Sequence, residues 1–284
     1  MGGPMCRNII AGGHSVVVCD KNPQAVERCT ALGAQAGATP KEVAGRVEVV
    51  MTSLPLPPNL EEVALGPDGI AAGAAKGLVH IDLSTNSPSF VRKIGAAMEE
   101  RGVPFLDAPV SGGVAGAEQG TIAIMVGGDA VLFERFRPVF DSFGKNVFHM
   151  GAVGAGSAAK LVNNMIAFCS MAAAAEGLML GTAAGLDPEQ LVEVVQASSG
   201  DSRGFRFLAE KALAGDWSPK FALDLGYKDI GLAGQMADEL NVPLSVAPPT
   251  QNLMRVARSM GFGSDDITSM ARVYEKLLGR TIKG

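Results

Sequence analysis

The sequence is poor in the residues that build metal centres and disulfide frameworks. It contains only four cysteines and three histidines, and none of them form a CxxC pair or a Cys/His cluster with the spacing of metal ligands. We therefore expect no metal site, and the histidines match no motif. The cysteines are expected to be reduced structural thiols: Cys6, Cys19, Cys29 and Cys169.

Basic clusters and long apolar runs are also scarce. The 24 Lys and Arg residues are scattered and are outnumbered by 29 Asp and Glu residues, which argues against a nucleic-acid partner. No charged and then apolar segment follows Met1, so we expect no signal peptide. The apolar run 161–175 contains two asparagines and is shorter than the ~20 residues of a membrane span. A buried core helix, no membrane partner and a cytoplasmic location are expected.

A length of 284 residues exceeds the usual size of one hydrophobic core, and 47% hydrophobic residues are enough to fill two. We predict a dinucleotide-binding domain at 1–151 and an all-helical substrate and dimerisation domain at 152–284. The boundary is placed at the glycine-rich segment that begins with Gly151.

Short runs rich in Val, Ile and Leu alternate with helical patterns in the first domain. This alternation predicts an α/β fold, a Rossmann-type doubly wound parallel sheet covered on both faces. The expected strands are 15–19, 47–54, 78–83, 104–108, 121–126 and 146–149, and the expected helices between them include 23–32, 59–65 and 87–101.

The second domain lacks convincing strand patterns. A helix from about 155 to 184 would be ~45 Å long and would form its spine. Because residues 165–186 are apolar around most of this helix, we predict a homodimer or homotetramer that covers the exposed side. The alternative is a monomer in which the chain's own helices cover it.

A dinucleotide site needs a strand, a GxGxxG turn, a helix and an acidic residue about 20 positions on. Here Met1 and Gly2 lead directly into a helix, and Gly2 takes the place of the third glycine. We therefore expect that the first strand and the first two glycines are missing, through a late start or a truncation. Met1 and Gly2 are candidate cofactor contacts.

Asp20 lies 18 positions after Gly2, where a carboxylate would bind the ribose hydroxyls of NAD. A 2′-phosphate would meet its negative charge, which favours NAD, although the adjacent Lys21 leaves NADP as an alternative. The other interpretation is that Asp20 only caps the turn at 20–23.

A further strand ends in the hydroxyl-rich segment 82–88. Because ligands of a doubly wound sheet bind at the carboxyl ends of its strands, Thr85 is a candidate cofactor contact. The alternative is plain N-capping of the next helix by Thr85 or Ser87.

Ser111, Gly112 and Gly113 form a hydroxylated glycine turn between two expected strands. Backbone N–H groups of such a turn can bind a small carboxylate, although an ordinary glycine turn is the alternative.

Lys160 and Asn164 are four residues apart and so share one face of the long helix. A lysine shielded from water can have a lowered pKa and accept a hydroxyl proton; the alternative is a solvated residue near the helix start. Together these features predict a dehydrogenase of small acids.

The segments 1–5, 107–113, 154–164 and 227–229 occur in the same order as in a known family. Over essentially its whole length the chain resembles the β-hydroxyacid dehydrogenases, in the branch with 3-hydroxyisobutyrate dehydrogenase and tartronate semialdehyde reductase. This resemblance implies a C-terminal domain similar to that of 6-phosphogluconate dehydrogenase. It also implies hydride transfer between NAD(P) and a small β-hydroxy acid, most simply of the 3-hydroxyisobutyrate type.

The resemblance assigns roles to particular residues. Lys160 matches the catalytic lysine and Asn164 the amide that orients substrate, while 111–113 match the turn that binds the substrate carboxylate. Thr85 and Lys228 match cofactor contacts, although Lys228 could instead be a surface residue of an amphipathic helix. Two other functions stay open: a tartronate or succinate-type semialdehyde reductase, and a non-catalytic truncated homologue that acts as a binding or scaffold protein.

Overall fold

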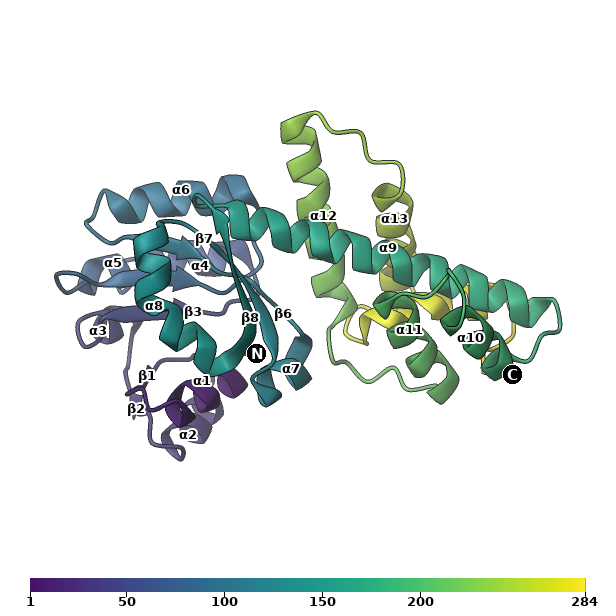
Figure 1. Ribbon diagram of the computed structural model, residues 1–284, viewed down its shortest axis with the longest axis horizontal. Helices are drawn as coiled ribbons and strands as arrows, with labels where there is room; N and C mark the ends of the chain where they lie inside the picture. The colour runs from purple at the N-terminus through teal and green to yellow at the C-terminus, as the bar shows by residue number, and fades with distance from the viewer. Residues whose placement is uncertain (284) are drawn as a thin grey trace. The chain divides into compact units, whose positions relative to one another are not determined.

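The computed structural model describes residues 1–283 and divides the chain into two compact units, Met1–Lys160 and Leu161–Gly284 (Figure 1). The first unit combines a sheet with helices and the second is helical, so the predicted fold class is confirmed. The division falls inside helix α9 (Ala155–Ala183), whose first turns belong to the α/β unit. The predicted boundary near Gly151 stays a prediction.

The main sheet of the first unit is mixed rather than parallel. Strands β3 (Val49–Thr52), β4 (Val79–Asp82) and β5 (Phe105–Asp107) run parallel. Next to β5 comes β7 (Ile122–Gly127), which is antiparallel to β5 and to β6 (Val110–Ser111). A parallel return needs a crossover of a dozen or more residues, and only the short helix α7 (Gly113–Gln119) joins β6 to β7. The expectation of an all-parallel sheet was therefore wrong at this edge, although β8 (Gly144–Gly151) again runs parallel to β7.

A second, two-stranded parallel sheet consists of β1 (Val17–Val18) and β2 (Gln35–Ala36), joined through helix α2 (Pro23–Thr30). The sequence pattern predicted β1, but β2 and β6 were missed. Each of these two strands has only two residues, which is too short for an alternating pattern to be recognised.

Helices cover both faces of the main sheet. On one face, α1 (Gly2–Ala11) and α8 (Ala130–Phe143) share a core with strand residues such as Leu106. The other face carries a second core, to which Phe105 belongs. Adjacent residues of one strand thus enter opposite cores, as the strand pleat requires. The helices of this second layer are α3 (Pro40–Ala44), α4 (Pro57–Leu65), α5 (Ile70–Gly73) and α6 (Pro88–Glu99).

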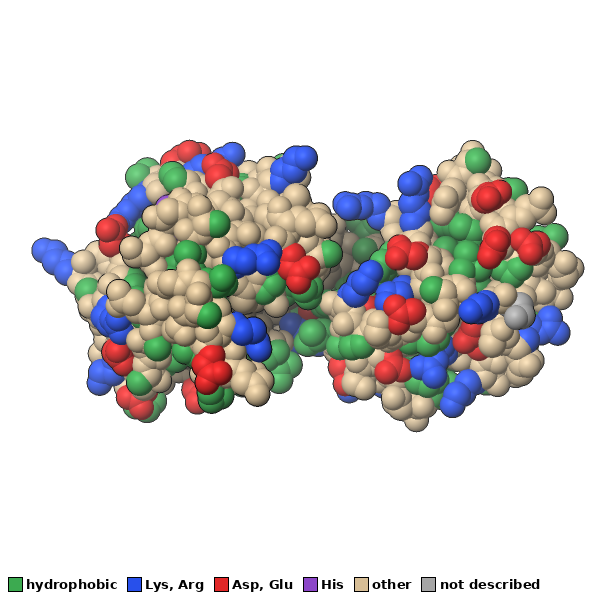
Figure 2. Space-filling model, turned by 90° about the horizontal axis from the view of Figure 1, so that it is seen from below, with side chains coloured by type: hydrophobic (Ala, Val, Ile, Leu, Met, Phe, Trp, Pro, Cys, Tyr) green, Lys and Arg blue, Asp and Glu red, His purple; other side chains and the backbone are tan. Residues whose placement is uncertain are grey.

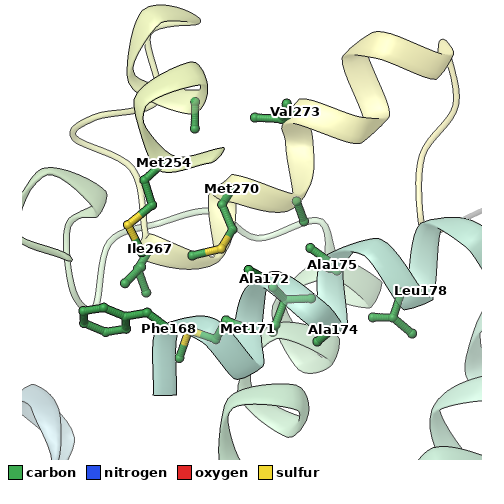
Figure 3. Packing of buried hydrophobic residues seen from close by; sticks show 14 of the residues in the cluster. Phe168, Met171, Ala172, Ala174, Ala175, Leu178, Met254, Ile267, Met270 and Val273 are labelled. Atoms are coloured by element: carbon green, nitrogen blue, oxygen red, sulfur yellow. The ribbon is translucent and has the colours of Figure 1, made fainter. Parts of the chain in front are cut away.

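The second unit is built around the rest of α9. Figure 3 shows Phe168, Met171 and Ala175 of α9 packed beside Met270 and neighbouring side chains of the C-terminal segments. Each large apolar side chain that is fully buried contributes about 1.5–3 kcal/mol relative to exposure. The surrounding helices are α10 (Pro188–Gln196), α11 (Arg203–Ala214), α12 (Leu223–Leu240), α13 (Ala247–Ser259), the 3₁₀ turn η1 (Ile267–Ala271) and α14 (Arg272–Leu278).

Within residues 1–283, α9 is the one helix that is long and apolar enough to cross a membrane. However, 44% of its most apolar window is buried inside the protein, and the window's side chains supply the core of the helical unit. Its apolar character therefore has an explanation within the fold.

Candidate active site

Three polar residues lie side by side where β3, β4 and β5 end. In the register of the parallel strands, Thr52 is paired with Asp82, and Asp82 with Asp107. Both aspartates are fully buried, which is costly for a carboxylate unless hydrogen bonds satisfy it. The carboxyl edge of such a sheet is where its ligands bind. The two buried carboxylates therefore mark this edge as the place to look for a site.

Asp82 anchors the turn that follows β4. Its Oδ1 accepts hydrogen bonds from the hydroxyls of Thr52 at 2.8 Å and Ser84 at 2.6 Å, and its Oδ2 accepts one from the Asn86 amide at 3.0 Å. Burial raises the pKa of Asp82, and the hydrogen bonds from Ser84 and Thr52 oppose that rise. The network holds the backbone of residues 84–86, which contains the predicted cofactor contact Thr85.

His80 joins this network from inside the sheet. Its Nε2 lies 2.9 Å from the Thr52 hydroxyl, and its ring meets Phe105 edge-on. Complete burial lowers the pKa of His80 to about 3, so the ring is neutral at physiological pH. His80 thus has a core role.

Ser87, rather than Thr85, caps helix α6. The Ser87 hydroxyl accepts the Phe90 N–H at 3.3 Å, as an N-cap residue does. The N-capping alternative therefore applies to Ser87. A cofactor contact by Thr85 stays a prediction.

The start of α1 offers open space for an anionic ligand. No side chain caps this helix, and a Cβ added to Gly2 or Gly3 would meet no atom within 4 Å. A helix N-terminus with such space suits the pyrophosphate of a dinucleotide. The carboxylate of Asp20 follows β1 and is exposed. Binding of a dinucleotide by the start of α1 and by Asp20 stays a prediction.

Asp20 also makes the contact expected if it caps the turn at 20–23. Its Oδ1 accepts the N–H of Asn22 at 2.8 Å, so the carboxylate does cap the turn. Lys21, the candidate phosphate contact, forms an exposed ion pair with Glu62 at 3.3 Å. Ribose binding by Asp20 stays a prediction.

The turn at 111–113 depends on its glycines. Gly112 and Gly113 have φ angles of 139° and 65°, which lie in the region that L-residues with a side chain rarely adopt. Ser111 ends β6, and α7 begins at Gly113. Binding of a carboxylate by the N–H groups of this turn stays a prediction.

Asp107 connects the end of β5 to the start of α9. Its Oδ1 accepts the Gly154 N–H at 2.7 Å and its Oδ2 accepts the Ser157 N–H at 2.6 Å. Burial raises the pKa of Asp107, and these two backbone hydrogen bonds oppose the rise. Lys160 lies one turn further along α9 and is 8% exposed, so it is shielded from water rather than solvated.

In the helical unit, Asn164 is held by a buried carboxylate. Its Nδ2 donates to Oδ2 of Asp229 on α12 at 2.8 Å, and its Oδ1 accepts from Asn163 at 3.1 Å. Oδ1 of Asp229 lies 3.1 Å from the Lys228 ammonium, whose side chain is 18% exposed. Lys228 is therefore engaged with Asp229 and is not a freely solvated surface residue.

The sequence interpretation gave no roles to Asp82, Asp107 or Asp229, although all three lie within segments that it singled out. A signal was available, because each aspartate sits in or beside a strand or helix pattern that predicts burial. A buried carboxylate needs partners, and those partners are distant in sequence. They could not be identified before the fold was known.

Metal-binding clusters, reactive cysteines and other cavities were the remaining candidates for a site among the described residues. Within residues 1–283, no group of three or more His, Cys, Asp and Glu side chains is placed to bind a metal. All four cysteines are free thiols. Burial and the neighbouring Cys29 raise the pKa of Cys6 to about 12, so it is no nucleophile at neutral pH. A cavity of ≈450 Å³ lies at the amino ends of β3 and β4, near Lys76, away from the polar edge.

Known proteins match the chain over nearly its whole length. Residues 1–151 match the NAD binding domain of 6-phosphogluconate dehydrogenase, and residues 154–274 match the family described as NAD-binding of NADP-dependent 3-hydroxyisobutyrate dehydrogenase. A 2-(hydroxymethyl)glutarate dehydrogenase of Eubacterium barkeri is 39% identical over 100% of this chain and 95% of its own length. A 3-hydroxyisobutyrate dehydrogenase of Pseudomonas aeruginosa is 38% identical over 96% and 95% of the two chains. The crystal structure of a 3-hydroxyisobutyrate dehydrogenase from Salmonella typhimurium superposes with a TM-score of 0.87 at 32% identity, covering 96% and 95%.

Proposed function

Because the chain belongs to the β-hydroxyacid dehydrogenase family, and is thus an NAD(P)-dependent hydroxyacid oxidoreductase, we propose that it oxidises 2-substituted 3-hydroxypropionates at their primary alcohol. Two of its relatives are named for 3-hydroxyisobutyrate and 2-(hydroxymethyl)glutarate. Both compounds have the form HOCH₂–CH(R)–COO⁻ and differ only in R. The product would be the corresponding semialdehyde, with the carboxylate retained.

The buried Lys160 is the observation that carries this proposal. Burial of a lysine is costly unless its ammonium is paired or gives up its proton, and a lysine that can give up its proton can act as a general base. In the proposed reaction, Lys160 takes the proton of the substrate hydroxyl. Asn164 orients the substrate, and the N–H groups of the turn at 111–113 bind its carboxylate.

The cofactor residues are assigned in the same way. Bound NAD(P)⁺ supplies a nicotinamide ring that accepts a hydride. Met1 and Gly2 at the start of α1 approach the pyrophosphate, and Asp20 binds the adenosine ribose. Thr85 and Lys228 complete the cofactor contacts. The carboxylate of Asp20 supports a preference for NAD, because it would repel a 2′-phosphate.

The two alternative functions are not favoured. A scaffold protein that had lost catalysis would have no need of a shielded Lys160 or of an amide held like that of Asn164. The relatives from Eubacterium barkeri and Pseudomonas aeruginosa are named as dehydrogenases, which also speaks against a non-catalytic homologue. The same residues would serve the reverse reaction at high concentrations of semialdehyde.

We also expect a homo-oligomer, a dimer or tetramer, working in the cytoplasm. Exposed apolar residues recur along α9, among them Ile166 and Leu180, which are 58% and 73% exposed. Figure 2 shows hydrophobic side chains exposed in patches on the helical unit. A second copy of the chain that packed against the exposed side of α9 would remove these apolar residues from water. The four free thiols fit a reducing compartment.

Reduction of NAD⁺ and NADP⁺, followed by absorbance, tests the proposed reaction. The substrates are 3-hydroxyisobutyrate, 2-(hydroxymethyl)glutarate and glycerate, and lactate is the control because its alcohol lies α to the carboxylate. We expect turnover with at least one 2-substituted 3-hydroxypropionate, a higher kcat/KM with NAD⁺, and no turnover of lactate. If all of the β-hydroxy acids fail with both cofactors, the proposal is wrong.

A further inference from the structure

Asp107 has an unusual set of partners for a fully buried carboxylate. Its backbone belongs to β5, four residues before Ser111, while both of its side-chain oxygens accept N–H groups from the start of α9. These donors are otherwise unsatisfied in the first turn of a helix, and the positive end of the helix dipole favours a negative charge there. Backbone N–H groups and the helix dipole thus stabilise the charge of Asp107.

The first turn of α9 lies directly on the sheet. A Cβ on Gly156 would overlap the carbonyl oxygen of Met125 in β7, and it would lie 2.9 Å from the carbonyl oxygen of Asp107. A Cβ on Gly127 would overlap the Asp107 carboxylate itself. Only glycine at these two positions permits so close an approach of helix and sheet. Asp107 therefore sits in a contact that has no room to shift.

The segment before α9 is held from the other side by α6. Val153 packs against Gly95, where an added Cβ would lie 3.3 Å from a Val153 methyl group. A Cβ added to Gly154 would likewise lie 2.9 Å from the guanidinium of Arg92. Lys160 is placed two helical turns after these contacts. Its position relative to β5 thus depends on how the first turn of α9 is docked.

We propose that Asp107 is a positioning residue for the reaction, which fixes the first turn of α9, and with it Lys160, relative to the Ser111–Gly113 turn. The same residue holds both parts: its main chain leads into the turn, and its side chain holds the helix. This inference rests on the proposed function, in which the turn binds the substrate carboxylate and Lys160 takes the hydroxyl proton. A shift of about 1 Å between two such groups can cost roughly 100-fold in rate.

Asp107→Asn tests the inference with little change of volume. An asparagine keeps one acceptor oxygen and turns an NH₂ group toward a backbone N–H, so one of the two contacts with α9 is lost. We expect kcat, counted per NADH-binding site, to fall by about 10- to 100-fold. The dissociation constant of NADH should change by less than about two-fold, because the cofactor residues at α1 and Asp20 are untouched.

The matched control is Asp129→Asn in the same unit. Asp129 caps α8 and its Oδ1 accepts the N–H groups of Val131 and Leu132, both at 2.9 Å, so the chemical change is the same. We expect kcat to stay near the wild-type value even if the melting temperature falls. A merely structural role of Asp107 would lower the number of NADH-binding sites without lowering kcat per site.

Amide hydrogen exchange gives a second test, which begins with the wild-type protein. The N–H groups of Gly154 and Ser157 should exchange slowly, as donors to a buried carboxylate, and faster in Asp107→Asn. Rapid exchange of both in the wild type would overturn the inference, as would wild-type kcat per site in Asp107→Asn. An inactive wild-type enzyme with slow exchange at both positions would instead contradict the proposed function and leave the contact intact.

Discussion

Asp229 accepts a hydrogen bond of 2.8 Å from the side-chain amide of Asn164, across 65 residues of sequence. Both side chains are buried, so the bond is not weakened by competing water. Because the amide donates to Asp229, its nitrogen and oxygen have defined orientations. The oxygen is held in turn by Asn163 at 3.1 Å. The amide predicted to orient substrate is therefore fixed before any substrate arrives.

Replacing Asp229 by alanine should remove this preorganisation. We expect kcat/KM for the hydroxy acid to fall by about 10-fold or more, because the Asn164 amide can then rotate and Lys228 loses its ion pair. Steady-state kinetics with saturating NAD⁺ measures the effect. Asp238→Ala, an exposed position on the same helix, serves as the control. Equal kcat/KM values for the two variants would refute a role of Asp229 in holding Asn164.

Lys160→Ala should abolish turnover and leave the affinity for NAD⁺ within a few-fold of wild type. The reason is that Lys160 handles the proton and not the nucleotide, and general acid–base catalysis contributes about 10²–10⁴-fold. Lys160→Arg should be equally inactive, because a guanidinium does not release its proton at accessible pH. Activity above about a tenth of the wild-type kcat in the alanine variant would exclude proton transfer by Lys160.

Two variants of Asp20 separate its possible roles. Asp20→Asn retains an acceptor for the Asn22 N–H but removes the charge, whereas Asp20→Ala removes both. If Asp20 binds the ribose, both variants should bind NAD⁺ more weakly. Both should also show a smaller ratio of NAD⁺ affinity to NADP⁺ affinity, because neither replacement side chain carries a charge that repels a 2′-phosphate. Dissociation constants for both nucleotides are the measurement. An unchanged NAD/NADP ratio in both variants would assign Asp20 to the turn alone.

His80 should make stability depend on pH in the acidic range. Burial lowers its pKa from 6.5 to about 3 in the folded protein. Below pH 6.5 the unfolded chain therefore binds a proton that the folded protein does not, and stability is lost as the pH falls toward 3. The raised pKa values of Asp82 and Asp107 act in the opposite direction, because the folded protein then binds protons more readily.

A comparison with His80→Gln isolates the histidine from these carboxylates. The variant should be less stable than wild type at pH 7, since the contact with Thr52 is disturbed. The difference in melting temperature should shrink between pH 6.5 and 4, because only the wild type loses stability through His80 there. A difference that stays constant over this range would contradict a neutral, buried His80.

The predictions from sequence succeeded where the pattern is local. The strand-helix alternation and the long helix expected at 155–184 each depend on residues close in the chain. The direction of β7 was missed because it depends on the connection after Ser111, where a short helix replaces a full crossover. The partners of Asp107 were missed because they lie 47 and 50 residues away. Contacts over such separations come from the packed fold, and no local pattern contains them.

Assembly is the remaining expectation, and it depends on one face of α9. Exposed apolar or small residues recur on that helix at intervals of three, four or seven: Val162, Ile166, Ala173, Gly177 and Leu180. The exposed Glu176 lies beside them, and its carboxylate accepts a hydrogen bond from the Tyr274 hydroxyl at 2.9 Å. The spacing of the apolar and small residues places them in one stripe, as in helices that pack against a partner helix. A two-fold dimer in which α9 meets α9 would bury the stripe on both copies at once.

Sedimentation at micromolar concentration should therefore show a dimer or a tetramer. Leu180→Glu should shift the sedimenting mass toward that of one chain. A carboxylate in an apolar interface would lose its water without gaining a partner. Val131→Glu is the matched control, because Val131 is 77% exposed on α8 of the other unit and lies outside the stripe. A wild-type protein that sediments as a single chain would rule out the oligomer. An oligomer that survives Leu180→Glu unchanged would place the interface on a surface other than this face of α9.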